Sequence, residues 1–343
     1  MTSPNKSNSQ KVPDAFDPAS CTGLLESIIS RIRAARRVQV IGHVRPDGDC
    51  VGSMLAMHHL LDHWNIDHRM AANKVTCNGY ALLEGFDRIA ETVDADFHPD
   101  LNVFIDCASL ERGLEGWQAT APIINNHQHS SNTRYGEINW IQPHCAAVGE
   151  MLFHLINQAG MPITPAVADN LLLSITTDTG SFKFSNTGPA QHRIAANLIE
   201  AGASVEAVTR MAFGSQHPGG VQLAGHVMST MRLECNGKLV WSEILQETYK
   251  QFGGEDKAPE NLVDVLRSIL GVELSLLFHE IHDGSLRLNL RSNGRINVSK
   301  LAHRWGGGGH PCASGLTIHN ANYETDRDSI LKAIIEEVDQ NLG

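Results

Sequence analysis

Two kinds of hydrophobic pattern alternate along the N-terminal part of the chain. Short continuous apolar runs predict buried strands, because the strands of a parallel sheet are covered on both faces. Apolar residues at helical spacing between these runs predict amphipathic helices. The predicted strands are 38–41, 69–72, 101–105 and 122–124, and the predicted helices are 24–32, 54–61, 146–159, 166–175 and 189–201. This alternation predicts an α/β fold with a parallel, doubly wound sheet.

The C-terminal part of the chain has a different pattern. Apolar runs at 231–234 and 239–242 flank an Asn-Gly pair, and runs at 272–280 and 285–291 flank an Asp-Gly pair. Both arrangements predict β-hairpins, because these dipeptides favour the tight turns that join antiparallel strands. A further strand at 316–319 and helices at 262–269 and 326–342 are also predicted. Together these elements predict a smaller α+β domain.

Composition places the domain boundaries. Glycine, serine and proline around 213–220 predict a linker, 206–225, between a first domain at 21–205 and a second at 226–343. Residues 1–20 are polar, contain three prolines and lack the apolar stretch of a signal peptide, which predicts a disordered tail rather than a secretion signal.

Charge and cysteine content exclude some classes of protein. The 343 residues carry a formal net charge of −11, which disfavours a protein that coats long nucleic acid through many phosphate contacts. Seven cysteines without a CxxC pair predict reduced thiols and a cytoplasmic location. No apolar run is long enough to span a membrane, so we expect no membrane partner.

A polar motif follows the first predicted strand. His43, Asp47 and Asp49 lie in a turn at the carboxyl end of 38–41, where open α/β sheets place their sites. An imidazole with hard oxygen ligands suits Mn²⁺, Fe²⁺ or Mg²⁺ better than structural zinc. Taken alone, the stretch also fits an ordinary Asp-Gly turn.

Further candidate ligands follow other predicted elements. Asp106 follows the strand 101–105, His127 and His129 follow 122–124, and Asp178 follows the helix 166–175. Several like charges in one place are unfavourable without a cation, so this cluster predicts bound metal. Two divalent ions are usual for phosphoester cleavage, and Asp106 is the most plausible shared carboxylate.

These motifs resemble, in order, those of the DHH phosphoesterases that carry a C-terminal DHHA1 domain. The resemblance starts near residue 22 and includes Thr177-Asp178-Thr179-Gly180 and the glycine-rich run 306–311. Within this family, the chain is similar to the standalone nanoRNase and pAp-phosphatase group. It implies that the first domain is catalytic and that the DHHA1 domain closes over its metal cleft and binds the nucleotide. It further implies two metal sites that share Asp106. His43, Asp47 and Asp106 would form one, and Asp49, Asp106, Asp178 and a histidine of the third motif the other.

The third motif departs from the Asp-His-His of the family. Without a gap, the triplet is His127-Gln128-His129, and Gln128 takes the place of the ligand histidine. With one inserted residue, it is Asn126-His127-Gln128, which keeps His127 as the ligand. Spacing favours the first register and chemistry the second. Either way an acidic residue is missing, and losses beside a metal site typically cost about 10–100-fold in affinity or activity. Asp106, His127 and His129 are the catalytic candidates.

The glycine-rich run predicts a substrate contact in the second domain. A flexible linker is the competing interpretation, but consecutive N–H groups without side chains also suit phosphate oxygens, and Arg291 precedes the run. The candidate substrate-binding residues are Arg291, Ser292, Gly307, Gly308, Gly309 and His310, with Arg134 from the first domain.

The expected function is a Mn²⁺-dependent phosphoesterase, with Mg²⁺ or Fe²⁺ as alternative ions. The resemblance implies short oligoribonucleotides, degraded from an end, or the 3′-phosphate of pAp as substrates, and a homodimer as the family's assembly. The alternatives are a nucleotide-binding sensor with a weakened centre and a cyclic-dinucleotide phosphodiesterase.

Overall fold

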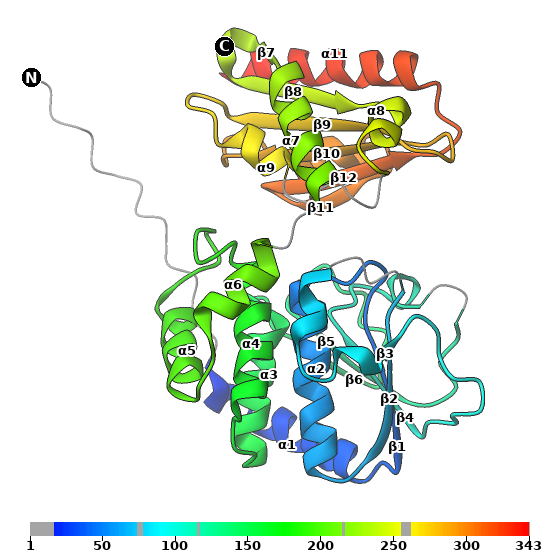
Figure 1. The fold of residues 1–343 in the computed structure, drawn as a ribbon, viewed down its shortest axis with the longest axis vertical. Coiled ribbons are helices and arrows are strands. Elements are labelled where there is room, and N and C mark those ends of the chain that lie inside the picture. The colour runs from blue at the N-terminus through cyan, green and yellow to red at the C-terminus, as the bar shows by residue number, and fades with distance from the viewer. Residues whose placement is uncertain (1–16, 74–77, 115–116, 215–216, 255–261, 343) are drawn as a thin grey trace, which may run out of the picture. The chain divides into compact units, whose positions relative to one another are not determined.

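The computed structural model describes residues 17–73, 78–114, 117–214, 217–254 and 262–342 (Figure 1). They form two compact units, which divide near residue 215. The predicted tail 1–20 lies almost entirely outside the described residues; its last part begins a short 3₁₀ helix, η1 (Pro18–Cys21). No described helix combines the length and the apolar character that crossing a membrane requires.

The first unit is built on a parallel sheet. Among its described residues the sheet has six strands in the order β3-β2-β1-β4-β5-β6. The strands are β1 (Arg37–Ile41), β2 (Asp67–Ala71), β3 (Ile89–Ala90), β4 (Leu101–Ile105), β5 (Ile123–His127) and β6 (Ile138–Ile141). The helices are α1 (Thr22–Arg33), α2 (Gly48–His63), α3 (Val148–Ala159), α4 (Pro165–Asp178), α5 (Pro189–Glu200) and α6 (Val205–Phe213). Short 3₁₀ turns are η2 (Asn78–Leu82), η3 (Phe86–Arg88) and η4 (Leu110–Arg112).

The strand order has one reversal. From β1 the chain adds β2 and β3 on one side and then returns to add β4, β5 and β6 on the other. Val38 of β1 pairs with His68 of β2 on one side and with Leu101 of β4 on the other, and both pairings are parallel. The carboxyl ends of β1 and β4 therefore meet where the order reverses, and such points are where open α/β sheets form their sites.

The two faces of this sheet are covered differently. The larger core joins one face to helices α1 to α4, and Met54, Leu60, Trp140 and Leu171 are fully buried within it. A smaller cluster covers the other face, where Phe104 packs with Leu114, Trp117 and Tyr135 from the loops after β4 and β5. Figure 1 shows the helices gathered on the first face.

The second unit has a mixed sheet. Its described strands number six, in the order β11-β12-β10-β9-β8-β7. They are β7 (Arg232–Glu234), β8 (Leu239–Ile244), β9 (Leu274–Glu280), β10 (Leu286–Ser292), β11 (Gly308–His310) and β12 (Ala313–Ile318). The other elements are α7 (Pro218–Thr230), η5 (Cys235–Gly237), α8 (Gln246–Gln251), α9 (Leu262–Arg267), α10 (Val298–His303) and α11 (Tyr323–Leu342). One face of the sheet packs on α10 and α11, and the other on α7, α8 and α9.

The predicted α/β class, the parallel sheet and both hairpins are confirmed. The expected linker 206–225 is instead largely helical, since α6 and α7 occupy most of it. Helix α7 begins after His217, whose side chain accepts a hydrogen bond from the N–H of Gly219, and Pro218 takes the first turn, where its missing N–H is harmless. A Cβ at Gly219 would lie 1.9 Å from the carbonyl oxygen of Phe252, so close packing, not flexibility, requires this glycine.

Candidate metal centre

Two polar side chains emerge where the strand order reverses. His43 lies just beyond β1, and Asp106 follows β4 directly. Asp106 has a φ of +57°, a left-handed conformation that Asp tolerates better than most residues. Its N–H donates to the carbonyl oxygen of Asn126 on β5, which ties the turn to the neighbouring strand. The backbone thus turns sharply to place this carboxylate at the sheet edge.

The start of helix α2 supplies two more carboxylates. Asp47 is the N-cap residue, and its Oδ1 accepts from the N–H of Cys50 at 3.0 Å. Asp49 lies in the first helical turn, where negative charge is favoured by the helix dipole. The sequence pattern placed both residues in a turn before a helix starting near residue 54; in fact α2 begins at Gly48, because Asp47 caps it.

Close packing of helices brings the last carboxylate to the same place. A Cβ at Gly52 of α2 would lie 2.3 Å from the carbonyl oxygen of Asn170 on α4, and one at Gly149 of α3 would lie 2.1 Å from Ser174 Oγ. Only glycine at these positions lets the three helices approach so closely. Asp178 is the last residue of α4 rather than part of a following turn, and this packing directs it toward Asp49.

His43, Asp47 and Asp106 form a set of donors that suits a divalent cation. Nε2 of His43 lies 3.3 Å from Asp106 Oδ2 and 3.8 Å from Asp47 Oδ1. Nδ1 of His43 donates to the carbonyl oxygen of Val44 at 3.0 Å, so in the neutral ring the Nε2 lone pair faces the two carboxylates. One ligand atom from each of the three residues falls within 4.8 Å of the others. These residues fit a metal ion.

Asp49 is fully engaged with donors from the protein. Oδ1 accepts from Ser174 Oγ at 2.6 Å and from Ser53 Oγ at 3.1 Å. The N–H groups of Val148 and Gly149, which open α3, donate to Oδ2 at 2.9 Å and to Oδ1 at 3.3 Å. Asp49 thereby caps α3 from another helix, because the first N–H groups of a helix have no partner within it.

The third motif lies at the end of β5. His127 is the last strand residue, and its Nε2 is 3.5 Å from Asp106 Oδ1. Gln128 comes next and donates through Nε2 to Asp49 Oδ2 at 3.2 Å and to Asp178 Oδ2 at 3.0 Å. The His129 ring is perpendicular to that of His127, with centroids 4.8 Å apart. The geometry favours the register without a gap, in which Gln128 stands where the family has its ligand histidine.

The centre holds an excess of buried negative charge. Burial, followed by the charges of neighbouring carboxylates, raises the pKa values of Asp49 and Asp178 well above the usual range. Burial alone would lower the pKa of His43, but Cys50 and Asp106 raise it, and the net shift is upward. All three shifts favour the protonated forms of these side chains. A bound cation would compensate the same excess of negative charge.

The sequence pattern missed the groups that support these carboxylates. Ser174 lies one helical turn before Asp178 on α4, so its spacing could have identified it as a residue facing the same site. The N–H groups at the start of α3 and the hydroxyl of Ser53 carry no recognisable motif. Asn132 also supports the centre: its Nδ2 donates to the carbonyl oxygen of Cys107 at 2.9 Å, which fixes the turn after Asp106.

The predicted substrate residues have contacts of their own. Arg134 is exposed in the first unit, with a φ of +54°. In the second unit, Arg291 Nε lies 3.3 Å from Asp264 Oδ2. Ser292 is 1% exposed and donates to Glu273 Oε1 at 3.0 Å, so its hydroxyl supports the fold rather than facing a ligand.

The predicted phosphate-binding loop is partly a strand. Gly308, Gly309 and His310 form β11, which pairs with β12 at one edge of the sheet. Gly307 precedes this strand, and a Cβ there would lie 2.4 Å from the carbonyl oxygen of Gly315. A Cβ at Gly309 would likewise lie 2.6 Å from the carbonyl oxygen of Ala313, so Gly307 and Gly309 are required for close packing on β12, in addition to any contact with substrate.

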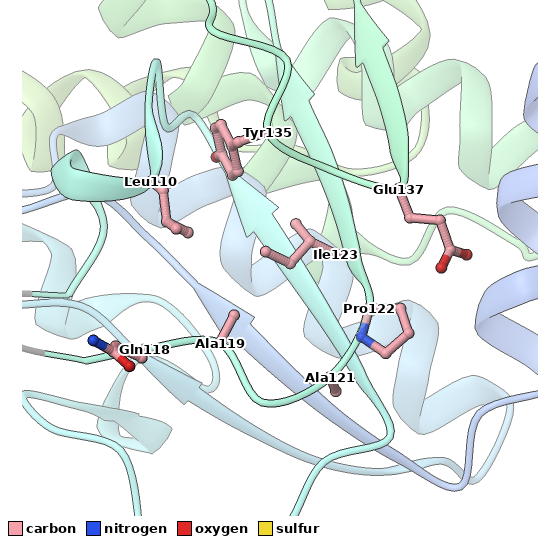
Figure 2. A pocket seen from close by; sticks show the side chains of 8 residues that line it. All are labelled: Leu110, Gln118, Ala119, Ala121, Pro122, Ile123, Tyr135 and Glu137. Atoms are coloured by element: carbon pink, nitrogen blue, oxygen red, sulfur yellow. The ribbon is translucent and has the colours of Figure 1, made fainter.

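A groove of about 540 Å³ is lined by none of the residues of the metal centre (Figure 2). It opens beside the start of β5, whereas His127 ends that strand and Gln128 follows it. Its lining residues are Leu110, Gln118, Ala119, Ala121, Pro122, Ile123, Tyr135 and Glu137. A mainly apolar lining with one carboxylate offers little to an anionic ligand, so this groove is not the centre of the chemistry.

Family models match both units. Residues 37–175 match the DHH family, N-terminal domain, from the first residue of β1 into α4, and residues 236–340 match the DHHA1 domain. This chain contains a DHH domain and a DHHA1 domain. The resemblance inferred from its motifs is thereby confirmed.

Curated relatives match this chain across both its DHH and its DHHA1 domain. It is 28% identical over 302 residues to the bifunctional oligoribonuclease and PAP phosphatase NrnA of Thermus thermophilus, covering 88% of this chain and 90% of that protein. It is 27% identical over 289 residues to the Bacillus subtilis protein of the same name, covering 83% and 90%. An exopolyphosphatase-related protein from Bacteroides fragilis shares the fold, with a TM-score of 0.84 at 21% identity over 93% of this chain and 97% of that chain.

Proposed function

We propose that this protein is a metal-dependent phosphoesterase that hydrolyses short oligoribonucleotides, the 3′-phosphate of pAp, or both. The observation that carries the proposal is the convergence of His43, Asp47 and Asp106 at the reversal point of the sheet. The names of the relatives, oligoribonuclease and PAP phosphatase, supply the substrate class. The net charge of −11 suits short substrates, which need few phosphate contacts.

Each residue of the centre has a proposed role. His43, Asp47 and Asp106 would hold a divalent ion, which supplies Lewis-acid stabilisation of the charge developing on the phosphoryl oxygens. Oxygen and imidazole donors suit Mn²⁺, with Mg²⁺ or Fe²⁺ as alternatives. His127 and His129 would move protons between the reacting oxygens and solvent, a role that imidazoles commonly take in catalysis. Arg291 and the glycine-rich strand β11 would bind phosphate.

A second candidate function rests on Gln128. An amide replaces an imidazole between Asp49 and Asp178, which favours a nucleotide-binding protein whose centre is weakened. Both candidate functions fit the same fold. They differ in whether the protein hydrolyses the nucleotide that it binds.

A substrate panel separates them. The full-length protein is incubated with Mn²⁺ and, in parallel, a labelled diribonucleotide, pAp and a cyclic dinucleotide. The phosphoesterase proposal predicts turnover of the diribonucleotide or pAp, abolished in Asp106→Asn and retained in the control Asp94→Asn, an exposed residue of the first unit. Tight binding without turnover of any substrate would support the sensor, and turnover of the cyclic dinucleotide alone would change the substrate class.

A further inference from the structure

The Gln128 side chain bridges two buried carboxylates. Its Nε2 lies 3.2 Å from Asp49 Oδ2 and 3.0 Å from Asp178 Oδ2, and the residue is 3% exposed. An amide nitrogen carries two hydrogens, so it can donate one to each carboxylate. The group between these two acids in the structure is therefore a neutral donor from the protein itself.

We propose that the Gln128 amide replaces the second metal ion expected between Asp49 and Asp178, so that this centre holds a single divalent ion at His43, Asp47 and Asp106. The inference rests on the proposed function for that first ion. It concerns how many ions the chain holds, not which substrate it takes.

Asp49 supports this inference independently of Gln128. A carboxylate offers about four lone-pair sites. Asp49 accepts from the hydroxyls of Ser53 and Ser174 and from the N–H groups of Val148 and Gly149, in addition to Gln128. These protein donors use the capacity of both oxygens. To bind a metal ion, Asp49 would have to give up the cap of α3 or the amide.

The first position differs in its donors. The contacts described for Asp106 Oδ1 and Oδ2 join them to the imidazoles of His127 and His43, whose ring nitrogens can act as acceptors or ligands. The Asp47 carboxylate accepts from the backbone N–H groups of Cys50 and Asp49. Lone pairs therefore remain for an ion at this position, whereas the position between Asp49 and Asp178 is taken by N–H groups.

A rotated amide is the competing arrangement. Among the described residues Gln128 Oε1 is buried and has no hydrogen-bond partner. Rotation of the amide by half a turn would place Oε1 against the two carboxylates, which is repulsive unless a second ion lies between them. A centre with two ions would thus use Oε1 as a ligand, and the number of bound ions distinguishes the two arrangements.

The test counts metal ions. Full-length wild type, Gln128→His and the control Gln118→His are stripped with EDTA, reloaded with Mn²⁺, freed of excess ion and analysed for manganese per chain. Gln118 lines the groove of Figure 2, so its substitution adds a histidine away from the carboxylates. Electron paramagnetic resonance of the same samples distinguishes isolated from spin-coupled Mn²⁺.

The proposal predicts about one Mn²⁺ per chain with an uncoupled signal in wild type and Gln118→His, and about two with a coupled signal in Gln128→His. About two ions in wild type would overturn it, as would a folded Gln128→His variant that still binds about one. If Gln128→His does not fold, the wild-type count alone decides. Absence of turnover beside a count of one would refute the proposed function and leave this inference standing; a wild type that binds no Mn²⁺ would overturn both.

Discussion

His43 and Asp106, far apart in the sequence, meet across the two central strands of the parallel sheet, with Nε2 of the imidazole 3.3 Å from Oδ2 of the carboxylate. Each follows its strand, β1 or β4, at the point where the strand order reverses. The contact results from topology: neighbouring parallel strands end at the same edge, so residues that follow them converge. The strand order of the sheet thus determines that these two candidate ligands lie together.

Asp106 is the residue whose loss should affect activity most. It faces both His43 and His127, and asparagine keeps its size and tolerates its positive φ. Loss of a residue that merely supports a metal ligand typically lowers metal affinity or activity about 10–100-fold. Asp106 is itself a candidate ligand, so we expect Asp106→Asn to lower kcat/KM by more than about 100-fold. The measurement is Mn²⁺-dependent hydrolysis of a diribonucleotide, with circular dichroism to confirm folding. A folded variant of near wild-type activity would remove Asp106 from the centre.

The close approach of α3 and α4 should be sensitive to one methyl group. A Cβ at Gly149 would lie 2.1 Å from Ser174 Oγ, the hydroxyl that donates to Asp49. We expect Gly149→Ala to lower the free energy of unfolding by about 1–3 kcal/mol through overpacking. Gly23 in α1 is the matched control: no atom lies within 4 Å of its Cβ position, so Gly23→Ala should raise that free energy by about 0.5–1 kcal/mol. Urea denaturation gives both values, and equal stability of the two variants would contradict the packing argument.

Arg291 offers a test of the substrate end. Its partner Asp264 also pairs with Arg267 at 2.9 Å, so loss of one guanidinium leaves the carboxylate compensated. A charge-assisted hydrogen bond to phosphate is worth about 1.5–3 kcal/mol, so Arg291→Gln should raise KM by about 10–100-fold. Arg304→Gln, which removes a surface pair with Glu337, is the control and should leave KM unchanged. Equal KM values for both variants would exclude Arg291 from phosphate binding.

The second unit should lose stability in acid because of His279. Burial, followed by the charge of Arg287, lowers the pKa of this imidazole to about 3, and Nδ1 lies 2.5 Å from the Tyr249 hydroxyl. The unfolded chain takes up this proton below about pH 6.5, and the folded chain does not, so the free energy of unfolding falls as the pH falls from about 6.5 toward 3.

The expected contribution is up to about 1.4 kcal/mol per pH unit. Urea denaturation of the full chain at about pH 7 and about pH 5 measures it, and His279→Gln, which cannot titrate, should show a shallower dependence on pH. The same dependence in both proteins would show that His279 is not the group responsible.

The parts of the fold that the sequence predicted are those with strong local signals. β1 and β4 are continuous apolar runs, as buried parallel strands require, and the Asn-Gly hairpin follows from its turn residues. β6 was not predicted, because four residues that include Asn139 give too short a pattern. Helix α7 was not predicted either, because its glycines resemble a linker until their packing against Phe252 is known.

The residues of the candidate site were likewise predicted only where the local sequence signal is strong. The acidic residues and His43 were predicted because each follows a strand or borders a helix, and their convergence follows from the sheet. The register of the third motif could not be settled from sequence, because a slip of one residue moves every side chain to the other face of the strand. Contacts between distant segments add information that the sequence lacks: the bonds of Gln128 to Asp49 and Asp178 favour the register without a gap. The sequence could not show the hydrogen bond from Ser292 to Glu273 either, because these two residues also lie in different segments of the chain.

The most direct test of the metal centre is to locate the ion. Crystals of the full-length protein soaked in Mn²⁺ give anomalous difference peaks at manganese positions. We expect a peak within bonding distance of His43 Nε2, Asp47 and Asp106. Peaks elsewhere, such as at the other described cluster of possible ligands, His58, Asp62 and His68, with none beside Asp106, would contradict it.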